Sequence, residues 1–301
     1  MTVSQQVASD GLIDAMATRW QEGSDDRGLV FARNEGGGRF SLRTDLPPGA
    51  GDFLQGVATG RFTDVETMQI ALSWHSGGRG IELLTVPTDP VEHPWRLERI
   101  SWISQDEALS AGDIDDDGRV DLLLGTIWLR NAESGWESLE IDPDRAKPDR
   151  NLLMDLNDDG LLDAIVGFEA ISEPGDVVWY EQVSAPTRRW VRHAIASVVG
   201  PMSLGARDMD MDGDQDLIVG EHNMRESHEA RLLLFENADG HGSRWVESVI
   251  HIGDEHHDGA VPIDIDADGD VDILSIGWSH GKVLLYENLG MRCRDAPSGS
   301  R

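Results

Sequence analysis

Hydrophobic residues occur along the chain in short runs separated by polar turns, without the 3.6-residue period of a helix. Runs such as DLLLG, DAIVG, DLIVG and DILSIG are too short for helices and are typical of buried strands. A second apolar segment follows each run and ends in a turn, as in LLLFENADG and VLLYENLG. The pattern therefore predicts an all-β protein.

Two further strands complete each repeat. A third predicted strand opens on an aromatic residue, as in the segments that begin at Trp95, Trp136, Trp190 and Trp245. We interpret these aromatics as packing within the sheets, because large rings bury extensive apolar area. A fourth strand, such as MSLGARD, leads into the next polar loop. Four strands per repeat with closely spaced turns favour a β-propeller over a two-sheet sandwich.

Asp-rich loops of nine residues define the repeat. Successive loops start between 42 and 56 residues apart, which suits one four-stranded propeller blade. Four copies are complete, and they are DIDDDGRVD (113–121), DLNDDGLLD (155–163), DMDMDGDQD (208–216) and DIDADGDVD (264–272). Two weaker copies precede them, QVASDGLID (6–14) and RFTDVETMQ (61–69). The chain is thus expected to form a propeller of about six blades.

The two ends leave alternatives open. The last repeat stops after VLLYENLG, so either the segment MTVSQQV completes the last blade or an upstream part is missing, as in an incomplete seven-bladed propeller. We expect one propeller domain over 1–290 and a polar tail over 291–301.

The complete loops carry oxygen donors at a spacing that suits calcium. Side chains at positions 1, 3, 5 and 9 and the carbonyl at position 7 can converge on one ion, and Gly at position 6 permits the tight turn. The EF-hand pattern is excluded because position 12 is Leu124, Val166, Val219 or Ser275 instead of Glu. The expected ligands are Asp113, Asp115, Asp117, Arg119 and Asp121; Asp155, Asn157, Asp159, Leu161 and Asp163; Asp208, Asp210, Asp212, Asp214 and Asp216; and Asp264, Asp266, Asp268, Asp270 and Asp272. About four structural Ca²⁺ ions are predicted, the alternative being acidic surface turns without metal.

These loops resemble those of the FG-GAP/VCBS repeat propellers, including the integrin α-subunit headpiece. The resemblance covers nearly the whole chain. It implies structural calcium ions that tie the first strand of a blade to the second, and a binding or scaffold module for carbohydrate or protein. It also implies a secreted, periplasmic or cell-surface protein, although MTVSQQVASDGL lacks the features of a signal peptide.

Histidines gather in the loops expected on the face opposite the calcium loops. Six residues past position 9, the equivalent places are Trp20, His75, Ile127, Glu169, His222 and Trp278. Imidazoles and carboxylates can hold a transition metal or move protons. A possible second site thus comprises His75, Glu221, His222, His256, His257, Asp258 and His280, the alternative being ordinary polar loops.

The stretch from His256 to Asn288 also looks like the propellers of aldos-2-ulose dehydratase-like proteins and of some polysaccharide lyases. That resemblance implies a sugar lyase or dehydratase with His222 and His257 as candidate bases and with Glu221 and His256 as metal or orienting partners. The choice between a binding module and an enzyme remains open at this point.

The composition of the chain limits the classes of partner that the protein can bind. The formal net charge of −31 argues against nucleic acid, which needs a basic surface. No apolar run approaches the ~18 residues of a membrane span. The single cysteine, Cys293, excludes an internal disulfide framework. We expect a monomer that is stabilised by packing and metal.

Overall fold

The computed structural model describes residues 2–5, 11–19, 28–51, 54–75, 78–105, 108–144, 147–184 and 189–290. Within these ranges every regular element is a β-strand, as the hydrophobic pattern predicts. Residues 6–10 of the first loop, Trp20, and the tail 291–301 with Cys293 lie outside the described residues.

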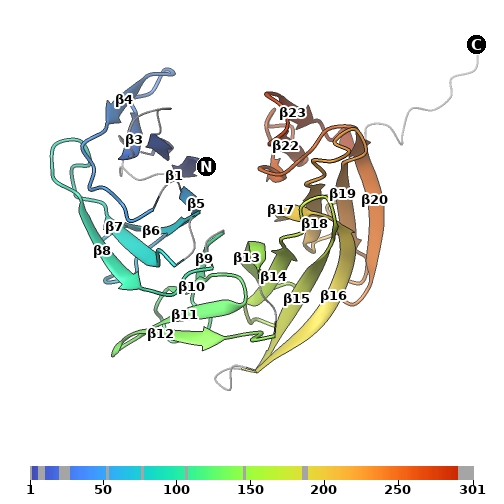
Figure 1. The fold of residues 1–301 in the computed structure, drawn as a ribbon, viewed down its shortest axis with the longest axis horizontal. Helices are drawn as coiled ribbons and strands as arrows, with labels where there is room; N and C mark the ends of the chain where they lie inside the picture. Colours follow the sequence, from blue (N-terminus) through green and yellow to red (C-terminus); the bar gives the residue numbers. More distant parts are fainter. Residues whose placement is uncertain are drawn as a thin grey trace, which may run out of the picture. The chain divides into compact units, whose positions relative to one another are not determined.

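The strands form six successive antiparallel sheets (Figure 1). In each sheet, neighbouring strands are also neighbours in the chain. The first sheet contains β1(Thr2–Gln5), β2(Asp14–Arg19), β3(Gly28–Asn34) and β4(Phe40–Arg43). The second contains β5(Leu54–Gly60), β6(Gln69–Trp74), β7(Ile81–Thr85) and β8(Arg96–Ser101). The third contains β9(Ser110–Gly112), β10(Asp121–Leu123), β11(Ile127–Ala132) and β12(Gly135–Glu140).

The remaining three sheets have the same plan. They are β13(Pro148–Met154), β14(Asp163–Phe168), β15(Pro174–Ser184) and β16(Arg189–Val199); β17(Pro201–Arg207), β18(Asp216–Glu221), β19(Arg231–Asn237) and β20(Trp245–Ile252); and β21(Val261–Ile263), β22(Asp272–Ile276) and β23(Val283–Tyr286). The last sheet has three strands among the described residues. Sequential antiparallel sheets of this kind are the blades of a β-propeller, so the predicted fold class is confirmed.

The Asp-rich loops join the first and second strands of their blades. In the fifth blade, Leu204 pairs with Val219 and Arg207 with Asp216, so loop 208–216 closes a hairpin between β17 and β18. At the N-terminus, Ser4 pairs with Ala15 of β2. Residues 2–5 therefore serve as the first strand of the first blade, and they do not complete the last blade.

The chain divides into two compact units. The N-terminal unit comprises 1–153 and 184–190, and the C-terminal unit comprises 154–183 and 191–301. The second strands of four blades are entirely buried, namely β6, β10, β14 and β18. This explains their continuous apolar sequence, because residues on both faces of such a strand contact neighbouring side chains.

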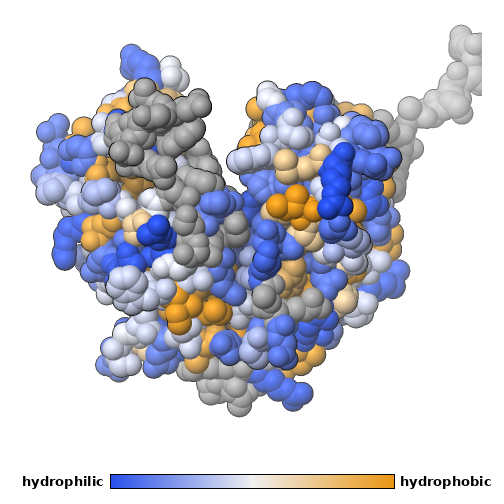
Figure 2. Space-filling view, in the orientation of Figure 1, coloured by the Kyte–Doolittle hydropathy of each residue, from blue (hydrophilic) through white to orange (hydrophobic). Residues whose placement is uncertain are grey.

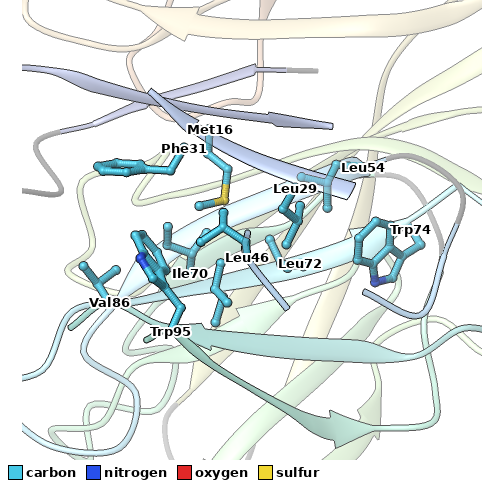
Figure 3. Packing of buried hydrophobic residues seen from close by; sticks show 11 residues of the cluster. Met16, Leu29, Phe31, Leu46, Leu54, Ile70, Leu72, Trp74, Val86 and Trp95 are labelled. Atoms are coloured by element: carbon cyan, nitrogen blue, oxygen red, sulfur yellow. The ribbon is translucent and has the colours of Figure 1, made fainter. Parts of the chain in front are cut away.

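One hydrophobic core of the N-terminal unit lies between its first and second blades, and another lies between its second and third blades. Met16, Leu29 and Phe31 of the first blade pack with Ile70 and Leu72 of the second (Figure 3). The ring of Trp95 lies 5.1 Å from that of Phe31, which agrees with the predicted packing role of this aromatic column. Hydrophilic residues cover much of the visible surface, with scattered hydrophobic patches between them (Figure 2).

Candidate functional site

The four complete Asp-rich loops share one backbone conformation. Position 4 is left-handed in every copy, with φ of 56° at Asp116, 60° at Asp158, 64° at Met211 and 60° at Ala267. Glycine at position 6 also has positive φ, from 85° at Gly118 to 105° at Gly213. A residue with a Cβ atom disfavours these positive φ values, which explains why glycine stands at position 6 in each loop.

The carboxylate at position 1 organises each turn. In loop 113–121, Asp113 accepts hydrogen bonds from the main-chain N–H of Asp117 at 3.0 Å and of Gly118 at 2.8 Å. Asp117 in turn accepts one from the N–H of Arg119 at 3.0 Å. The same three bonds occur in the other complete loops at Asp155 and Asp159, at Asp208 and Asp212, and at Asp264 and Asp268. The loops are thus ordered by local hydrogen bonds.

The aspartate at position 9 links the loop to the sheet. Asp216 is buried, and it accepts from the N–H of Met209 at 2.9 Å and of Asn237 on β19 at 2.9 Å. An Asn or Gln makes this bond in five blades, and these residues are Asn34, Asn131, Gln182, Asn237 and Asn288. Our sequence reasoning missed them, although the recurring dipeptides RN, EQ and EN at the end of the second apolar segment mark their positions.

Three loops bring carboxylates close enough to hold a metal ion. Each group offers oxygens from positions 1, 3 and 9 that lie within 4.8 Å of one another, and the groups are Asp113, Asp115 and Asp121; Asp208, Asp210 and Asp216; and Asp264, Asp266 and Asp272. Loop 155–163 has the same turn but Asn157 at position 3, which offers an amide oxygen instead of a carboxylate. Hard oxygen donors in this number suit Ca²⁺ or Mg²⁺.

Burial and like charges raise the pKa values of several loop carboxyls. Burial is the main cause at Asp163, where it raises the pKa to about 7, and at Asp121, where it raises the pKa to about 6. At Asp214 burial and the charges of Asp212 and Asp216 raise the pKa to about 6. A bound cation would favour the ionised forms, because it offsets both the repulsion and the lost solvation.

Two further carboxylate oxygens fit a bound cation. Oδ1 of Asp214 and Oδ1 of Asp270, both at position 7, are buried without a hydrogen-bond partner. A buried oxygen of this kind is costly unless a donor or a cation satisfies it. The donor set of these loops therefore fits a divalent cation.

The loops of the first two blades differ. In the first blade, Asp14 keeps the structural bond of position 9, accepting from the N–H of Asn34 at 2.9 Å. In the second blade, Gln69 stands at position 9, and its Oε1 accepts from the N–H and the hydroxyl of Thr63, each at 3.0 Å. In this turn a neutral amide takes the place of the position 9 carboxylate, and the carboxylate of Asp64 accepts from the N–H of Glu66 at 2.9 Å and of Thr67 at 2.6 Å.

The predicted histidine face yields a smaller cluster, centred on a residue that the sequence analysis did not single out. Glu255 is fully buried, and its Oε1 lies 2.5 Å from Nδ1 of His222 and accepts from the N–H of His257 at 2.8 Å. Burial would raise the pKa of Glu255, but the hydrogen bonds from His222 and Ser279 outweigh it, so the pKa lies below its usual value. As an ionised acceptor, Glu255 holds the Nδ1–H of His222 and orients the ring.

His257 lies beside this pair. Its ring centroid is 4.2 Å from that of His222 and 6.0 Å from that of Trp278, whose side chain is 63% exposed. Nδ1 of His257 is buried and lies 2.9 Å from Oδ1 of Asp258, without the geometry of a hydrogen bond. The cluster thus presents two oriented imidazoles next to an exposed indole ring.

Other predicted members of the second site have structural roles. Glu221 is buried and bound by the guanidinium of Arg231 at 2.5 Å. Nε2 of His280 donates to the carbonyl of Glu255 at 2.9 Å, and its Nδ1 accepts from the N–H of Lys282 at 3.2 Å. Both side chains are therefore committed to holding the loops.

His256 and His75 also lie apart from the pair. The ring of His256 contacts Ser275 and faces His251 and Tyr286, and burial lowers the pKa of His256 to about 4. His75 follows β6 in the N-terminal unit, as predicted for a position at the end of a second strand. Ile127 differs from that expectation because β10 ends at Leu123, so Ile127 already begins β11.

Comparison with protein families supports the repeat assignment. Residues 155–219 match the model of an FG-GAP-like repeat, a span that includes loops 155–163 and 208–216. A comparison with curated proteins found no match. The match and the six blades together support an FG-GAP repeat propeller, as the sequence predicted. Such a fold is in general a binding or scaffold module, and FG-GAP repeats are typical of extracellular or surface proteins.

The structure describes no helix that could cross a membrane.

Proposed function

We propose that this chain is a calcium-stabilised FG-GAP propeller that serves as a binding or scaffold module. The observation that carries this proposal is the repetition of one loop geometry, with three carboxylates within 4.8 Å of one another in three of the blades. Each ion would bind to the loop between the first two strands of a blade and offset the repulsion between the carboxylates of that loop. In that arrangement calcium stiffens the blades and takes no part in chemistry.

Thermal unfolding of the full chain tests the calcium proposal. A site that binds only the folded state stabilises it by about 2.7 kcal/mol when free calcium is about 100 times the dissociation constant. We expect a chelator to lower Tm and calcium to restore it, with magnesium at matched ionic strength as the control. An unchanged Tm after complete removal of calcium would overturn the proposal.

We place the ligand surface of this module at the histidine cluster, where Trp278 is exposed beside His257. An exposed indole next to fixed hydrogen-bonding groups suits a sugar ring, since apolar stacking and polar contacts can act together. Carbohydrate is therefore the favoured ligand class, with a protein as the alternative.

A panel of oligosaccharides, measured by calorimetry, checks this surface. Trp278→Ala should abolish binding, whereas Trp102→Ala should not, although Trp102 in the other unit is even more exposed, at 76%. If no oligosaccharide binds, the carbohydrate proposal is wrong and a protein is the proposed ligand.

A second candidate function is a sugar lyase or dehydratase, and the His222–Glu255 pair favours it. In such an elimination, Nε2 of His222 would take a proton from the carbon next to a carboxyl or carbonyl group, a carbon–oxygen bond would break, and the departing oxygen would take a proton. Glu255 would orient the base, a role that the sequence assigned to Glu221 and His256. Release of an unsaturated product, lost in His222→Ala and in Glu255→Gln, would support an enzyme; no product with any acidic sugar would refute it.

The same cluster is the proposed place for a transition metal, with donors from His222, His257 and Asp258. The described residues contain no group here in which three donors lie within 4.8 Å of one another, so these side chains would have to move to bind an ion together. Metal analysis after dialysis in calcium should find one zinc or manganese that is lost in His257→Ala and kept in His228→Ala. Retention of the metal in His257→Ala would exclude this place.

A further inference from the structure

The four complete loops share a motif, but in loop 113–121 the guanidinium of Arg130 already lies against the carboxylates. Nε of Arg130 lies 2.5 Å from Oδ2 of Asp115, and its Nη2 lies 2.9 Å from Oδ2 of Asp117. These two carboxylates stand at positions 3 and 5, which were predicted to bind calcium in loop 113–121. The side chain of Asp115 is only 3% exposed, so the pair is largely shielded from water.

The place of Arg130 in its blade is defined by the sheet. It directly precedes Asn131, whose N–H donates to Asp121 at position 9 at 2.7 Å. The residue that precedes the equivalent Asn or Gln in the later blades is a glutamate, and these are Glu181, Glu236 and Glu287. Only in the third blade does a complete loop face an arginine from this position.

One of these glutamates also contacts its loop. Oε1 of Glu181 lies 3.5 Å from Nδ2 of Asn157 at position 3 of its loop. Glu236 has the same place in the fifth blade, directly before Asn237, whose N–H donates to Asp216 at 2.9 Å. One position of the sheet thus directs either a positive or a negative side chain at position 3.

We propose that the residue directly before this Asn or Gln determines which cation each loop binds. A glutamate there adds a ligand to a calcium site, whereas the side chain of Arg130 takes the place of the cation in loop 113–121. The guanidinium donates to both carboxylates and offsets one of their two negative charges, and its fixed planar shape suits such paired contacts. Calcium can enter that loop only by displacing Arg130. The inference rests on the calcium proposal above, and it implies three tight calcium sites instead of four.

The surroundings of Arg130 leave room for such an exchange. A surface hollow of about 620 Å³ lies beside it, lined by Asp117, Arg119, Glu133 and Glu137 among others. If Arg130 is removed, water and a hydrated ion can reach Asp115 and Asp117 from this hollow.

Calcium titration of the full chain by calorimetry and equilibrium dialysis tests the inference. The wild type should bind three ions tightly, and Arg130→Glu should add a fourth or tighten a weak fourth at least tenfold. The reverse exchange, Glu236→Arg, should lose one ion. Arg96→Glu is the matched control, because Arg96 is an exposed residue of β8 and its substitution changes the net charge by the same amount.

A second measurement separates this inference from the calcium proposal. In a chelator, Arg130→Ala should lower Tm because Asp115 and Asp117 lose their cation, and saturating calcium should largely restore it. If the wild type binds four ions of similar affinity and Arg130→Glu changes nothing, the inference is wrong although the calcium proposal stands. If no variant binds calcium, the calcium proposal fails, and the Tm of Arg130→Ala in chelator still shows whether Arg130 neutralises its loop.

Discussion

The second and fifth blades solve the same structural problem with different chemistry. Both must connect a first strand to a buried second strand through nine residues. In the fifth blade, Asp216 accepts two main-chain N–H groups while its neighbours Asp208 and Asp210 converge with it. In the second blade, Gln69 takes the same position, binds Thr63, and donates to the hydroxyl of Thr85 at 3.2 Å.

The difference separates two roles that the Asp-rich motif combines. One role is to satisfy main-chain N–H groups of the loop, such as those of Met209 and Thr63, and a neutral amide can perform it. The other is to gather negative charge, which is unfavourable unless a cation offsets it. A blade can therefore keep its fold without metal, but a loop with gathered carboxylates gains stability from an ion.

The largest expected effect comes from breaking the linking residue itself. Asp216→Ala leaves two buried N–H groups without an acceptor, and we expect a loss of about 2–5 kcal/mol. Gln69→Ala should cost about 1–3 kcal/mol for the same reason. Urea unfolding should show the loss at Asp216 to be larger in calcium than in chelator, and the loss at Gln69 to be equal in both. A calcium-dependent effect at Gln69 would contradict the comparison.

The pH dependence of the calcium-free protein should show the gathered charge directly. Burial raises the pKa of Asp163 from 3.8 to about 7, so the folded state holds this proton more tightly than the unfolded state. In chelator, stability is therefore greatest at low pH on this account and falls by roughly 2–4 kcal/mol as pH rises from about 4 to about 7.

Calcium should flatten or reverse this trend, because it binds the ionised carboxylates. Tm values in chelator and in calcium at pH 5 and pH 8 check the sign. Asp163→Asn, which does not titrate, should weaken the dependence in chelator. A stability that rises with pH in chelator by a similar amount would show that these carboxyls do not control it.

A smaller effect is expected from the turn at position 6. Gly213 has φ of 105°, and a Cβ there meets no neighbour within 4 Å, so the cost of Gly213→Ala is purely conformational. We expect a loss of about 1–2 kcal/mol. Gly281 has equally open surroundings without positive φ, so Gly281→Ala should change stability by less than about 0.5 kcal/mol. Equal losses of stability in the two variants would contradict this explanation.

The smallest effect concerns position 4, where the loops differ in residue type. Met211 is left-handed with φ of 64°, whereas the equivalent Asp116 and Asp158 belong to a residue type that tolerates this region. Met211→Asn should therefore stabilise the fifth blade by about 0.5–1 kcal/mol. Asp116→Asn has no such strain to relieve and is the control. A destabilising result in urea at Met211 would contradict this account.

The sequence determined much of the fold because its signals are local. Positions 1, 5, 6 and 7 of each loop bond to one another within a few residues, so the motif alone specifies the turn and the hairpin around it. The buried second strands and the aromatic column likewise follow from short segments. These features placed the six blades and the metal loops without knowledge of the tertiary structure.

Only the tertiary structure decided which side chains meet across strands. The contact of Arg130 with Asp115 depends on the register between β10 and β11, because a shift of one residue would turn Arg130 to the other face of the sheet. The pairing of His222 with Glu255 joins a loop of the fifth blade to the segment that connects the fifth and sixth blades, 33 residues further along the chain. The sequence could point to the loops that carry these residues, but their partners follow from how strands and blades pack, and that packing determines which loops hold a cation and which imidazole has an oriented nitrogen.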